Sequence, residues 1–296
     1  MSIPTAYSAV IFVWATTPLG ILWSGETVHP ILAALLRMML AASIGVFILK
    51  LRGIDFPWHK PARRVYALSS VGVFGGMFCT YMAAQHLSSG VISVMYGLTP
   101  IFSGLLAWSI LKEQDFGPQK WLATSVSLGG LVLVCSSNIV VNDYRAIILL
   151  LVGVILFSVS SILVKRESNK EDGDDIHPFA VALGAIVMSI PAYAIAWLIM
   201  DQGELHMDEW GLRSIMAIAY LAIFGSLIGF FSYFYVLRHL PATTVALITL
   251  ITPVFAVAMG HTFNHEALEP SLIYGGLLVM LGLIIYFWGG SLKPST

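Results

Sequence analysis

The sequence predicts an all-α membrane protein in which ten transmembrane helices form two five-helix repeats of opposite orientation. Composition, the spacing of the apolar segments and an internal repeat each support this fold class. Of the 296 residues, 58% are hydrophobic and only 10% are charged, and the mean hydropathy is +0.86. Because about a quarter of the residues of a soluble domain are charged, we expect most of this surface to face lipid.

The apolar segments have the length of transmembrane helices. Crossing a bilayer takes about 20 largely apolar residues, and only helices or closed barrels can do it. The segments lack the alternation of a membrane barrel, so they predict helices. The ten spans lie at residues 5–24, 29–50, 64–86, 89–111, 118–137, 145–165, 177–200, 211–237, 241–263 and 270–289. Proline is favoured in a first helical turn, and it stands at or near the start of five spans, as Pro30, Pro118, Pro178, Pro241 and Pro270.

Basic side chains indicate the orientation of the spans. With the N-terminus in the cytoplasm, twelve of the fifteen Lys and Arg residues lie on the cytoplasmic side, namely Lys50, Arg52, Lys60, Arg63, Arg64, Lys112, Lys120, Lys165, Arg166, Lys170, Arg238 and Lys293. Arg145 and Arg213 lie on the other side, and Arg37 lies within a span. Cytoplasmic loops carry an excess of Lys and Arg, so we expect both termini in the cytoplasm. Residues 1–9 contain neither Lys nor Arg, so we expect the first span to stay as a transmembrane helix.

The fourth predicted span has a second copy in the ninth. "LTPIFSGLLAWSILKE" at 98–113 aligns with "ITPVFAVAMGHTFNHE" at 251–266 at an offset of 153 residues (252 − 99 = 153). The offset pairs Thr99 with Thr252, Pro100 with Pro253, Phe102 with Phe255 and Glu113 with Glu266. Each repeat holds five spans, an odd number, so the second copy must be threaded upside down. We therefore predict repeats at residues 1–138 and 139–296, an arrangement typical of secondary transporters.

Several segments also carry a family resemblance. "HPILAALLR" (29–37), "HLSSGVISVMYGLTPIFSGLLAWSILKEQ" (86–114) and "LGGLVLV" (128–134) resemble the first half of an EamA-type transporter of the drug/metabolite transporter superfamily. "HLPATTVALITLITPVFAVAMGHTFNHE" (239–266) and "GGLLVMLGLIIYF" (275–287) resemble the second half. The resemblance implies two inverted five-helix halves and the export or exchange of small metabolites. Two departures are the Lys-Glu end of span 4, where the family commonly has Gly-Glu, and the histidine-rich end of span 9.

Three prolines inside spans predict kinks or hinges. Pro18, Pro100 and Pro253 each leave the carbonyl four residues earlier without its helical partner, and in a membrane that carbonyl needs another donor. Two interpretations are open. The kinks are bending points beside a central cavity, or Thr99 and Thr252 simply satisfy the freed carbonyls.

Arg37 is the one Lys or Arg that lies far from a span end. It lies eight residues into span 2, about 12 Å deep at 1.5 Å per residue, and an intramembrane charge normally faces a cavity or a partner. It is interpreted either as an anchor for an anionic group of a substrate or as a structural arginine bonded to free carbonyls such as that of Trp14. A substrate site needs apolar walls with a few placed polar groups. The predicted substrate-binding residues are Trp14, Thr17, Arg37, Tyr81, Tyr96, Ser158, Tyr233 and Thr249.

These features predict an inner-membrane carrier that moves a small amphipathic metabolite, such as an amino acid, by alternating access. Its expected partners are the substrate and the lipid bilayer, with no nucleic acid and no cofactor. One alternative cargo is a phosphorylated or nucleotide-linked solute. Another alternative is an intramembrane enzyme that uses His261, His265 and Glu266, although this spacing is not that of a zinc protease and no metal site is predicted.

Overall fold

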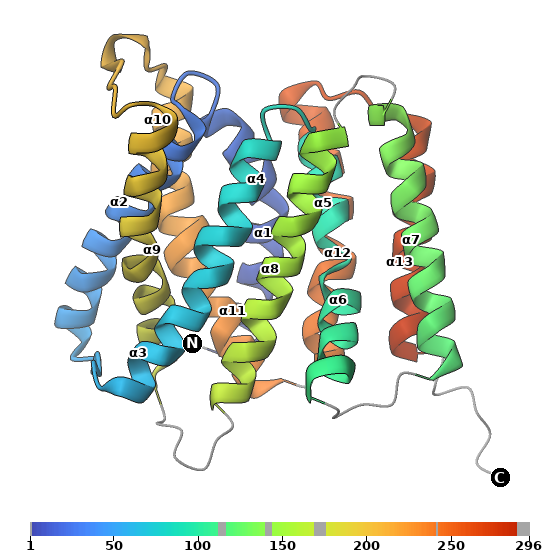
Figure 1. Ribbon diagram of the computed structural model, residues 1–296, viewed down its shortest axis with the longest axis horizontal. Helices are drawn as coiled ribbons and strands as arrows, with labels where there is room; N and C mark the ends of the chain where they lie inside the picture. The colour runs from blue at the N-terminus through green and yellow to red at the C-terminus, as the bar shows by residue number, and fades with distance from the viewer. Residues whose placement is uncertain (1, 112–116, 140–143, 169–175, 241, 289–296) are drawn as a thin grey trace.

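The computed structural model describes residues 2–111, 117–139, 144–168, 176–240 and 242–288. Within these ranges the chain forms ten long helical segments, which confirms the predicted spans (Figure 1). The first five segments are α1 (Ile3–Ser24), α2 (Pro30–Arg52), α3–η1–α4 (Lys60–Ser70, Val71–Gly76, Met77–Ala83), α5–α6–η2 (Ser89–Tyr96, Thr99–Leu106, Ala107–Leu111) and α7 (Pro118–Ile139). The second five are α8 (Tyr144–Ser168), α9 (Pro178–Met200), α10–η4–α11 (Leu212–Tyr220, Leu221–Ile228, Gly229–His239), α12 (Ala242–Asn264) and α13 (Pro270–Trp288). A short helix, η3 (Met207–Glu209), precedes α10.

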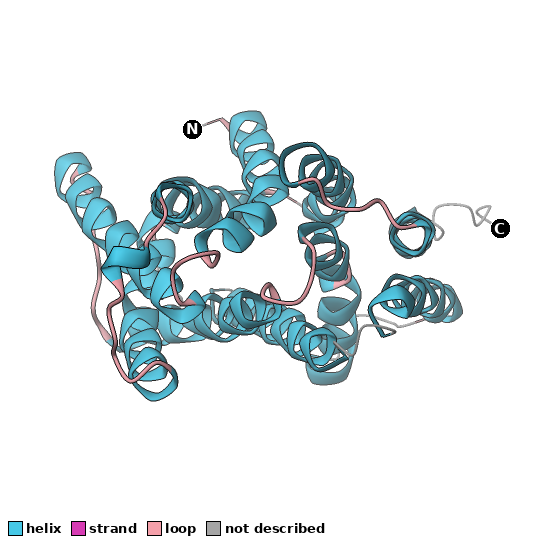
Figure 2. Cartoon of the chain, turned by 90° about the horizontal axis from the view of Figure 1, so that it is seen from above, coloured by secondary structure: helices cyan, strands magenta, loops and turns pink. Residues whose placement is uncertain are grey.

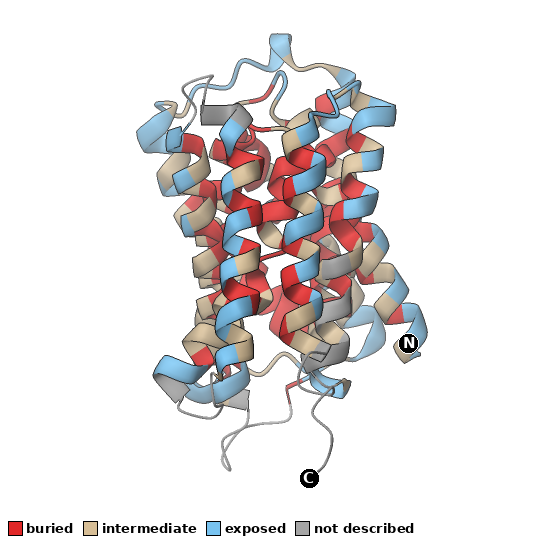
Figure 3. Ribbon diagram, turned by 90° about the vertical axis from the view of Figure 1, so that its right-hand side faces the viewer, coloured by how far each residue is buried: buried red, intermediate tan, exposed pale blue. Residues whose placement is uncertain are grey.

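Eight of these segments are long and apolar enough to cross a membrane. Their outward faces carry large exposed apolar side chains, such as Phe12, Phe47 and Ile199, which are 61%, 63% and 75% exposed. On the helices seen in Figure 3, buried residues lie mainly on the face that points into the bundle and exposed residues on the opposite face. An apolar exposed face is the expected complement of lipid tails.

The two halves run in opposite directions through the bundle. In Figure 1, α1 rises from the lower end to the upper end, whereas α8, the first helix of the second half, descends from the upper end. The odd number of spans in each half produces this inversion. The lower end carries the chain segments rich in Lys and Arg, where α2 ends, α3 begins and α8 ends.

The third and eighth spans contain matching π-helical segments. η1 (Val71–Gly76) and η4 (Leu221–Ile228) overlap when shifted by the repeat offset of 153 residues, since 71 + 153 = 224 and 76 + 153 = 229. A π-helical turn disturbs the regular hydrogen-bond ladder and is frequent at functional sites. In η1 the carbonyl of Val73 accepts a hydrogen bond from the hydroxyl of Tyr193 at 2.9 Å. The carbonyl of Gly76 accepts bonds from Thr80 at 2.8 Å and Tyr96 at 3.3 Å.

α7 and α13 form a closely packed pair at one side of the bundle, near the C-terminal end (Figures 1 and 2). Gly130 and Gly275 face each other, and a Cβ on either would lie 2.6 Å from the carbonyl oxygen of the other. Such close backbone approach through small residues is typical of helix contacts in membranes. The remaining eight segments enclose the centre of the bundle.

Candidate functional site

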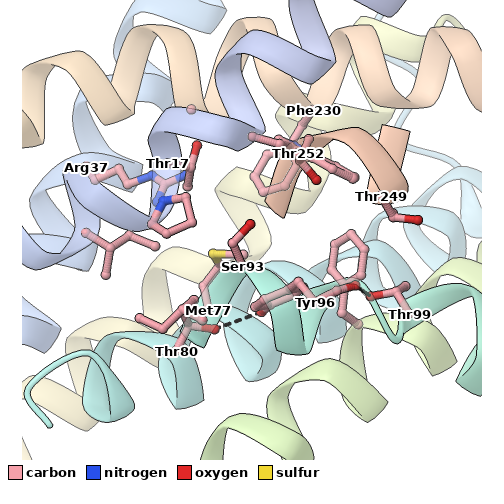
Figure 4. Close-up of a pocket in the computed structure, with 16 residues that line it drawn as sticks. Thr17, Arg37, Met77, Thr80, Ser93, Tyr96, Thr99, Phe230, Thr249 and Thr252 are labelled. Atoms are coloured by element: carbon pink, nitrogen blue, oxygen red, sulfur yellow. Dashed lines mark hydrogen bonds between the residues drawn. The ribbon is translucent and has the colours of Figure 1, made fainter. Parts of the chain in front are cut away.

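A cavity lies between the two halves, in the middle of the bundle (Figure 4). The empty space among its lining atoms is about 670 Å³, counted with the open space at its mouth. Helices of both repeats line it, with α1, α2, α4, α5 and α6 on one part and α8, η4, α11 and α12 on the other. The lining residues are Trp14, Thr17, Pro18, Ile21, Arg37, Met77, Thr80, Ile92, Ser93, Tyr96, Thr99, Phe157, Gly225, Phe230, Thr249 and Thr252.

The cavity brings together most of the residues that the sequence singles out. Five of the eight predicted substrate-binding residues line it: Trp14, Thr17, Arg37, Tyr96 and Thr249. Three of the five predicted hinge residues do so as well: Pro18, Thr99 and Thr252. In Figure 4, Arg37 and Thr17 lie on one side of the cavity, with Thr252 and Phe230 across from them.

Three predicted substrate-binding residues, Tyr81, Ser158 and Tyr233, are not among the residues that line the cavity. Tyr81 is 0% exposed, and its hydroxyl accepts a long bond of 3.5 Å from Arg37. Ser158 donates to the carbonyl of Val154 at 2.8 Å in its own helix. Tyr233 packs against Trp14 with 4.9 Å between ring centroids. These contacts are with other side chains or with the residue's own helix.

Arg37 is the charged residue of the described cavity lining. It is 1% exposed, its Nε donates to the hydroxyl of Ser226 at 2.8 Å, and one terminal nitrogen donates to Tyr81. Neither bond goes to a carbonyl, so the predicted contact with the freed carbonyl of Trp14 is not what holds it. Among the described residues Arg37 forms no ion pair with a carboxylate. Arginine has five N–H donors; two of those on Arg37 have acceptors among the described residues, which leaves three without one there.

The two Thr-Pro steps differ in structure. In the first half α5 ends at Tyr96 and α6 begins at Thr99, so the span breaks at residues 97–98. The hydroxyl of Thr99 donates to the carbonyl of Tyr96 at 2.6 Å, the carbonyl that Pro100 leaves free, as the simpler interpretation predicts. In the second half α12 continues through Pro253 without a break. Neither Pro100 nor Pro253 is among the described lining residues; the adjacent threonines are.

Sequence reasoning missed half of the lining: Ile21, Met77, Thr80, Ile92, Ser93, Phe157, Gly225 and Phe230. Most of these are apolar residues within apolar spans, and nothing in the sequence separates them from lipid-facing neighbours. Ser93 carries a usable signal, because a hydroxyl in the middle of a span needs a partner. Gly225 has no side chain by which the sequence could single it out as a lining residue. A Cβ there would lie 3.0 Å from a terminal nitrogen of Arg37, so glycine leaves room for the guanidinium.

Different kinds of contact hold the helices together at the two ends of the bundle. At the upper end Trp23 donates to the side chain of Asn264 at 2.9 Å, and Arg213 bonds both Asn264 and Glu26 at 3.1 Å. At the lower end, aliphatic and aromatic side chains of α1, α8, α11 and α12 form a cluster of buried residues: Ala6, Val10, Phe157, Tyr233, Val236 and Ile248.

Glu266 caps the start of α5. Its carboxylate accepts hydrogen bonds from the hydroxyl of Ser89 at 2.8 Å and from the backbone N–H of Ser89 at 3.2 Å. A carboxylate is favourable at a helix N-terminus, so this glutamate has the structural role of a helix-end residue. Its repeat partner Glu113 lies outside the described residues. His261 contacts the backbone carbonyl of Glu266 through Nδ1 at 3.0 Å, and the described residues hold no group of three or more potential metal ligands.

Comparison with known proteins identifies the family. The model of the EamA-like transporter family matches the chain twice, over residues 4–136 and 144–288. The chain belongs to the EamA-like transporter family. The two matches coincide with the two five-helix halves, so the family domain is present twice and the fold is the one that the sequence predicts.

Relatives across bacteria and archaea share the full length of the chain. It is 25% identical over 290 residues to an uncharacterized inner membrane transporter, YedA, of Escherichia coli K12, covering 95% of this chain and 91% of the relative. It is 24% identical to an uncharacterized transporter of Archaeoglobus fulgidus, covering 92% and 94%. A solved crystal structure that is 16% identical superimposes with a TM-score of 0.72 over 99% of both chains, which shows the shared fold. The protein is therefore a multi-pass membrane transporter of small molecules.

Proposed function

We propose that this chain is an inner-membrane secondary transporter that exports a small amphipathic carboxylate, an amino acid or a related compound, by alternating access. The cavity between the inverted halves is the binding site. One half moves against the other and exposes that cavity to each side in turn, as is typical of transporters built from inverted repeats.

The observation that carries the proposal is the state of Arg37. Burying a cation costs several kcal/mol unless a partner and hydrogen bonds offset it, and the described surroundings of Arg37 offer two neutral hydroxyls. Its guanidinium borders the cavity, where three N–H donors remain for a ligand. Guanidinium groups favour bidentate binding of carboxylates, so an acidic group of the substrate is the partner that fits.

The walls of the cavity supply the apolar part of the site. Trp14, Phe157 and Phe230 line it, and Trp14 meets Phe157 edge to face with 6.0 Å between ring centroids. Aromatic walls with a few polar groups are typical of small-molecule sites. A substrate with one acidic head and an apolar body matches this lining.

The orientation follows from the basic residues. Lys50, Arg52, Lys165 and Arg166 lie in the last turns of α2 and α8, at the same end of the bundle. The excess of Lys and Arg on cytoplasmic loops supports a cytoplasmic position for that end and for both termini.

Other functions fit less well. A phosphorylated or nucleotide-linked solute carries two or more negative charges, and Arg37 is the one Lys or Arg among the described lining residues. An intramembrane enzyme built on His261, His265 and Glu266 would need a free carboxylate, but that of Glu266 is bonded to the start of α5.

The proposal is tested by flux through Arg37→Ala in reconstituted vesicles against a panel of small carboxylates. Losing one charge-assisted interaction costs about 1.5–3 kcal/mol, or roughly 10-fold to 150-fold in affinity. We expect flux of the carried acid to fall at least tenfold while membrane insertion and size-exclusion behaviour stay unchanged. Arg145→Ala, which removes an exposed arginine at the start of α8, is the matched control. Undiminished transport by Arg37→Ala would overturn the binding role.

A further inference from the structure

Two hydroxyls in the cavity wall have no hydrogen-bond partner among the described residues. Ser93 of α5 is 4% exposed and Thr252 of α12 is 6% exposed, and both line the cavity. The other lining hydroxyls of Thr17, Thr80 and Thr99 donate to backbone carbonyls within hydrogen-bond distance. Neither hydroxyl oxygen is among the fully enclosed side-chain atoms of the described residues that lack a partner, so both face the open space of the cavity. A polar group of a ligand could take the place of water there as the hydrogen-bond partner of Ser93 and Thr252.

The hydroxyls of Ser93 and Thr252 form a second polar part of the site, separate from Arg37. In Figure 4, Ser93 points into the middle of the cavity, between Arg37 on one side and Thr252 on the other. Ser93 comes from the first half and Thr252 from the second, and their helices α5 and α12 pack against each other. A ligand bonded to Arg37 and to both hydroxyls would contact both halves of the transporter.

The charge of the cavity lining restricts the charge of the ligand group that could bind at Ser93 and Thr252. The described lining contains one cation, Arg37, and no carboxylate. A substrate with a single negative charge would make the occupied site neutral. A zwitterion would leave one positive charge uncompensated in a low-dielectric site, and its ammonium would lie close to the guanidinium. Buried charges are stable only when they are paired.

We propose that the substrate is a monoanion with three parts: a carboxylate at Arg37, an apolar body against Trp14 and Phe230, and a neutral hydrogen-bonding group at Ser93 and Thr252. That neutral group is a hydroxyl, a keto oxygen or an acylated nitrogen, because serine and threonine hydroxyls both donate and accept. The inference rests on the proposed function and narrows it to carboxylates that lack a free ammonium group.

Three acids with one carbon skeleton test this directly: 3-phenyllactate (hydroxyl), phenylalanine (ammonium) and 3-phenylpropionate (neither). A second series with an aliphatic body uses 2-hydroxyisocaproate, leucine and 4-methylpentanoate. Binding to the purified full-length protein is measured by thermal shift and by uptake into vesicles. We expect the hydroxy acid of at least one series to bind and to be carried at least tenfold better than the matching amino acid.

Variants of Ser93 and Thr252 test whether the hydroxyl of the ligand bonds to these two residues or whether the substitutions only disturb folding and binding in general. Ser93→Ala combined with Thr252→Val should weaken the hydroxy acid about fivefold to tenfold, as expected for losing a neutral hydrogen bond. It should leave the acid without a hydroxyl unchanged. Thr262→Val is the matched control, since Thr262 is exposed and bonds only the carbonyl of Ala258 in its own helix. Size-exclusion profiles and melting curves check that each variant folds.

Each outcome decides something different. If the amino acid is carried better than the hydroxy acid and its transport depends on Arg37, the inference of a monoanionic substrate fails while the proposed function stands. If the double variant weakens both acids equally, Ser93 and Thr252 do not form a distinct contact and the inference also fails. If none of the six acids binds or moves, while a cationic amine such as phenethylamine does, both the inference and the proposed function fail.

Discussion

Arg37 is buried among neutral groups, and these surroundings favour a binding role over a structural role. An arginine that stabilises a membrane bundle normally has its donors satisfied by carboxylates or carbonyls within the protein. The described partners of Arg37 are the hydroxyls of Ser226 and Tyr81, and the latter bond is 3.5 Å long. The fold therefore bears the cost of this cation, which is what the proposed binding of an anionic ligand would offset.

Replacing Arg37 by an apolar side chain of similar length should separate stability from transport. Buried charges replaced by well-packed apolar residues are often neutral or stabilising. We expect Arg37→Met to keep the thermal unfolding midpoint of the ligand-free protein or to raise it, while transport of the carboxylate is lost. The measurement is a melting curve in detergent beside a flux assay, with Arg145→Met as the control. A marked drop in the midpoint of Arg37→Met alone would make Arg37 a structural residue.

Among single residues, the sequence could predict that Arg37 borders the cavity, but not which residues of the apolar helices line the cavity with it. An ionisable residue deep in an apolar span stands out in any sequence, and the cavity contains it. Tyr81, Ser158 and Tyr233 are predicted by similar reasoning and are not among the lining residues of the cavity. Which side of a uniformly apolar helix faces the cavity depends on packing against its neighbours, and residue order along such a helix carries little of that information.

The fourth and ninth spans show how one residue changes an element. Both carry a Thr-Pro step, yet only the fourth breaks, between α5 and α6. Gly97 stands at the break, three residues before Pro100, and the aligned residue in the second half is Leu250 (97 + 153 = 250). A Cβ at Gly97 would lie 2.8 Å from the carbonyl oxygen of Val94, closer than real Cβ contacts allow. The break therefore requires glycine, and its position was not predictable from the matching Thr-Pro steps.

Gly97→Ala should destabilise the protein because the backbone around the break must shift to admit the Cβ. Overpacking of this kind costs about 1–3 kcal/mol, so we expect a lower thermal midpoint and reduced transport. Gly129→Ala is the matched control. Gly129 lies in α7 with nothing near its Cβ position, and alanine is favoured over glycine in a helix by about 1 kcal/mol. Equal midpoints for the two variants would show that the break does not depend on Gly97.

For the whole molecule, the sequence was sufficient to predict the number of spans and their inversion. Polar breaks and helix-starting prolines delimit ten spans, and the odd number in each repeat forces the second to run the opposite way. The contacts between helices at the two ends of the bundle could not be predicted from the sequence. It depends on residues far apart in the chain, such as Trp23 with Asn264 and Glu26 with Arg213.

The ion pair at the upper end contributes little to holding that end together. The side chains of Arg213 and Glu26 are 48% and 37% exposed, and an exposed ion pair contributes about 0–1 kcal/mol. Opening this end would break polar contacts such as those of Trp23 with Asn264 and of Ser89 with Glu266, whereas opening the lower end would part an apolar cluster around Val10 and Tyr233. Two ends closed by separate groups of residues are what a carrier with alternating access needs.

The most direct test of this account is whether one cavity position is reached from both sides of the membrane. Met77 lines the cavity, so Met77→Cys is prepared in a chain whose two native cysteines, Cys79 and Cys135, both buried, are replaced by alanine. An impermeant maleimide is added to vesicles of known orientation from one side at a time. Val132→Cys is the control that neither side should label, because Val132 lies well inside α7 and is 66% exposed on the outer surface of the bundle.

We expect the reagent to modify Met77→Cys from each side, and a carried acid to slow both reactions by occupying the cavity. Modification from one side only, with and without the acid, would contradict alternating access through this cavity.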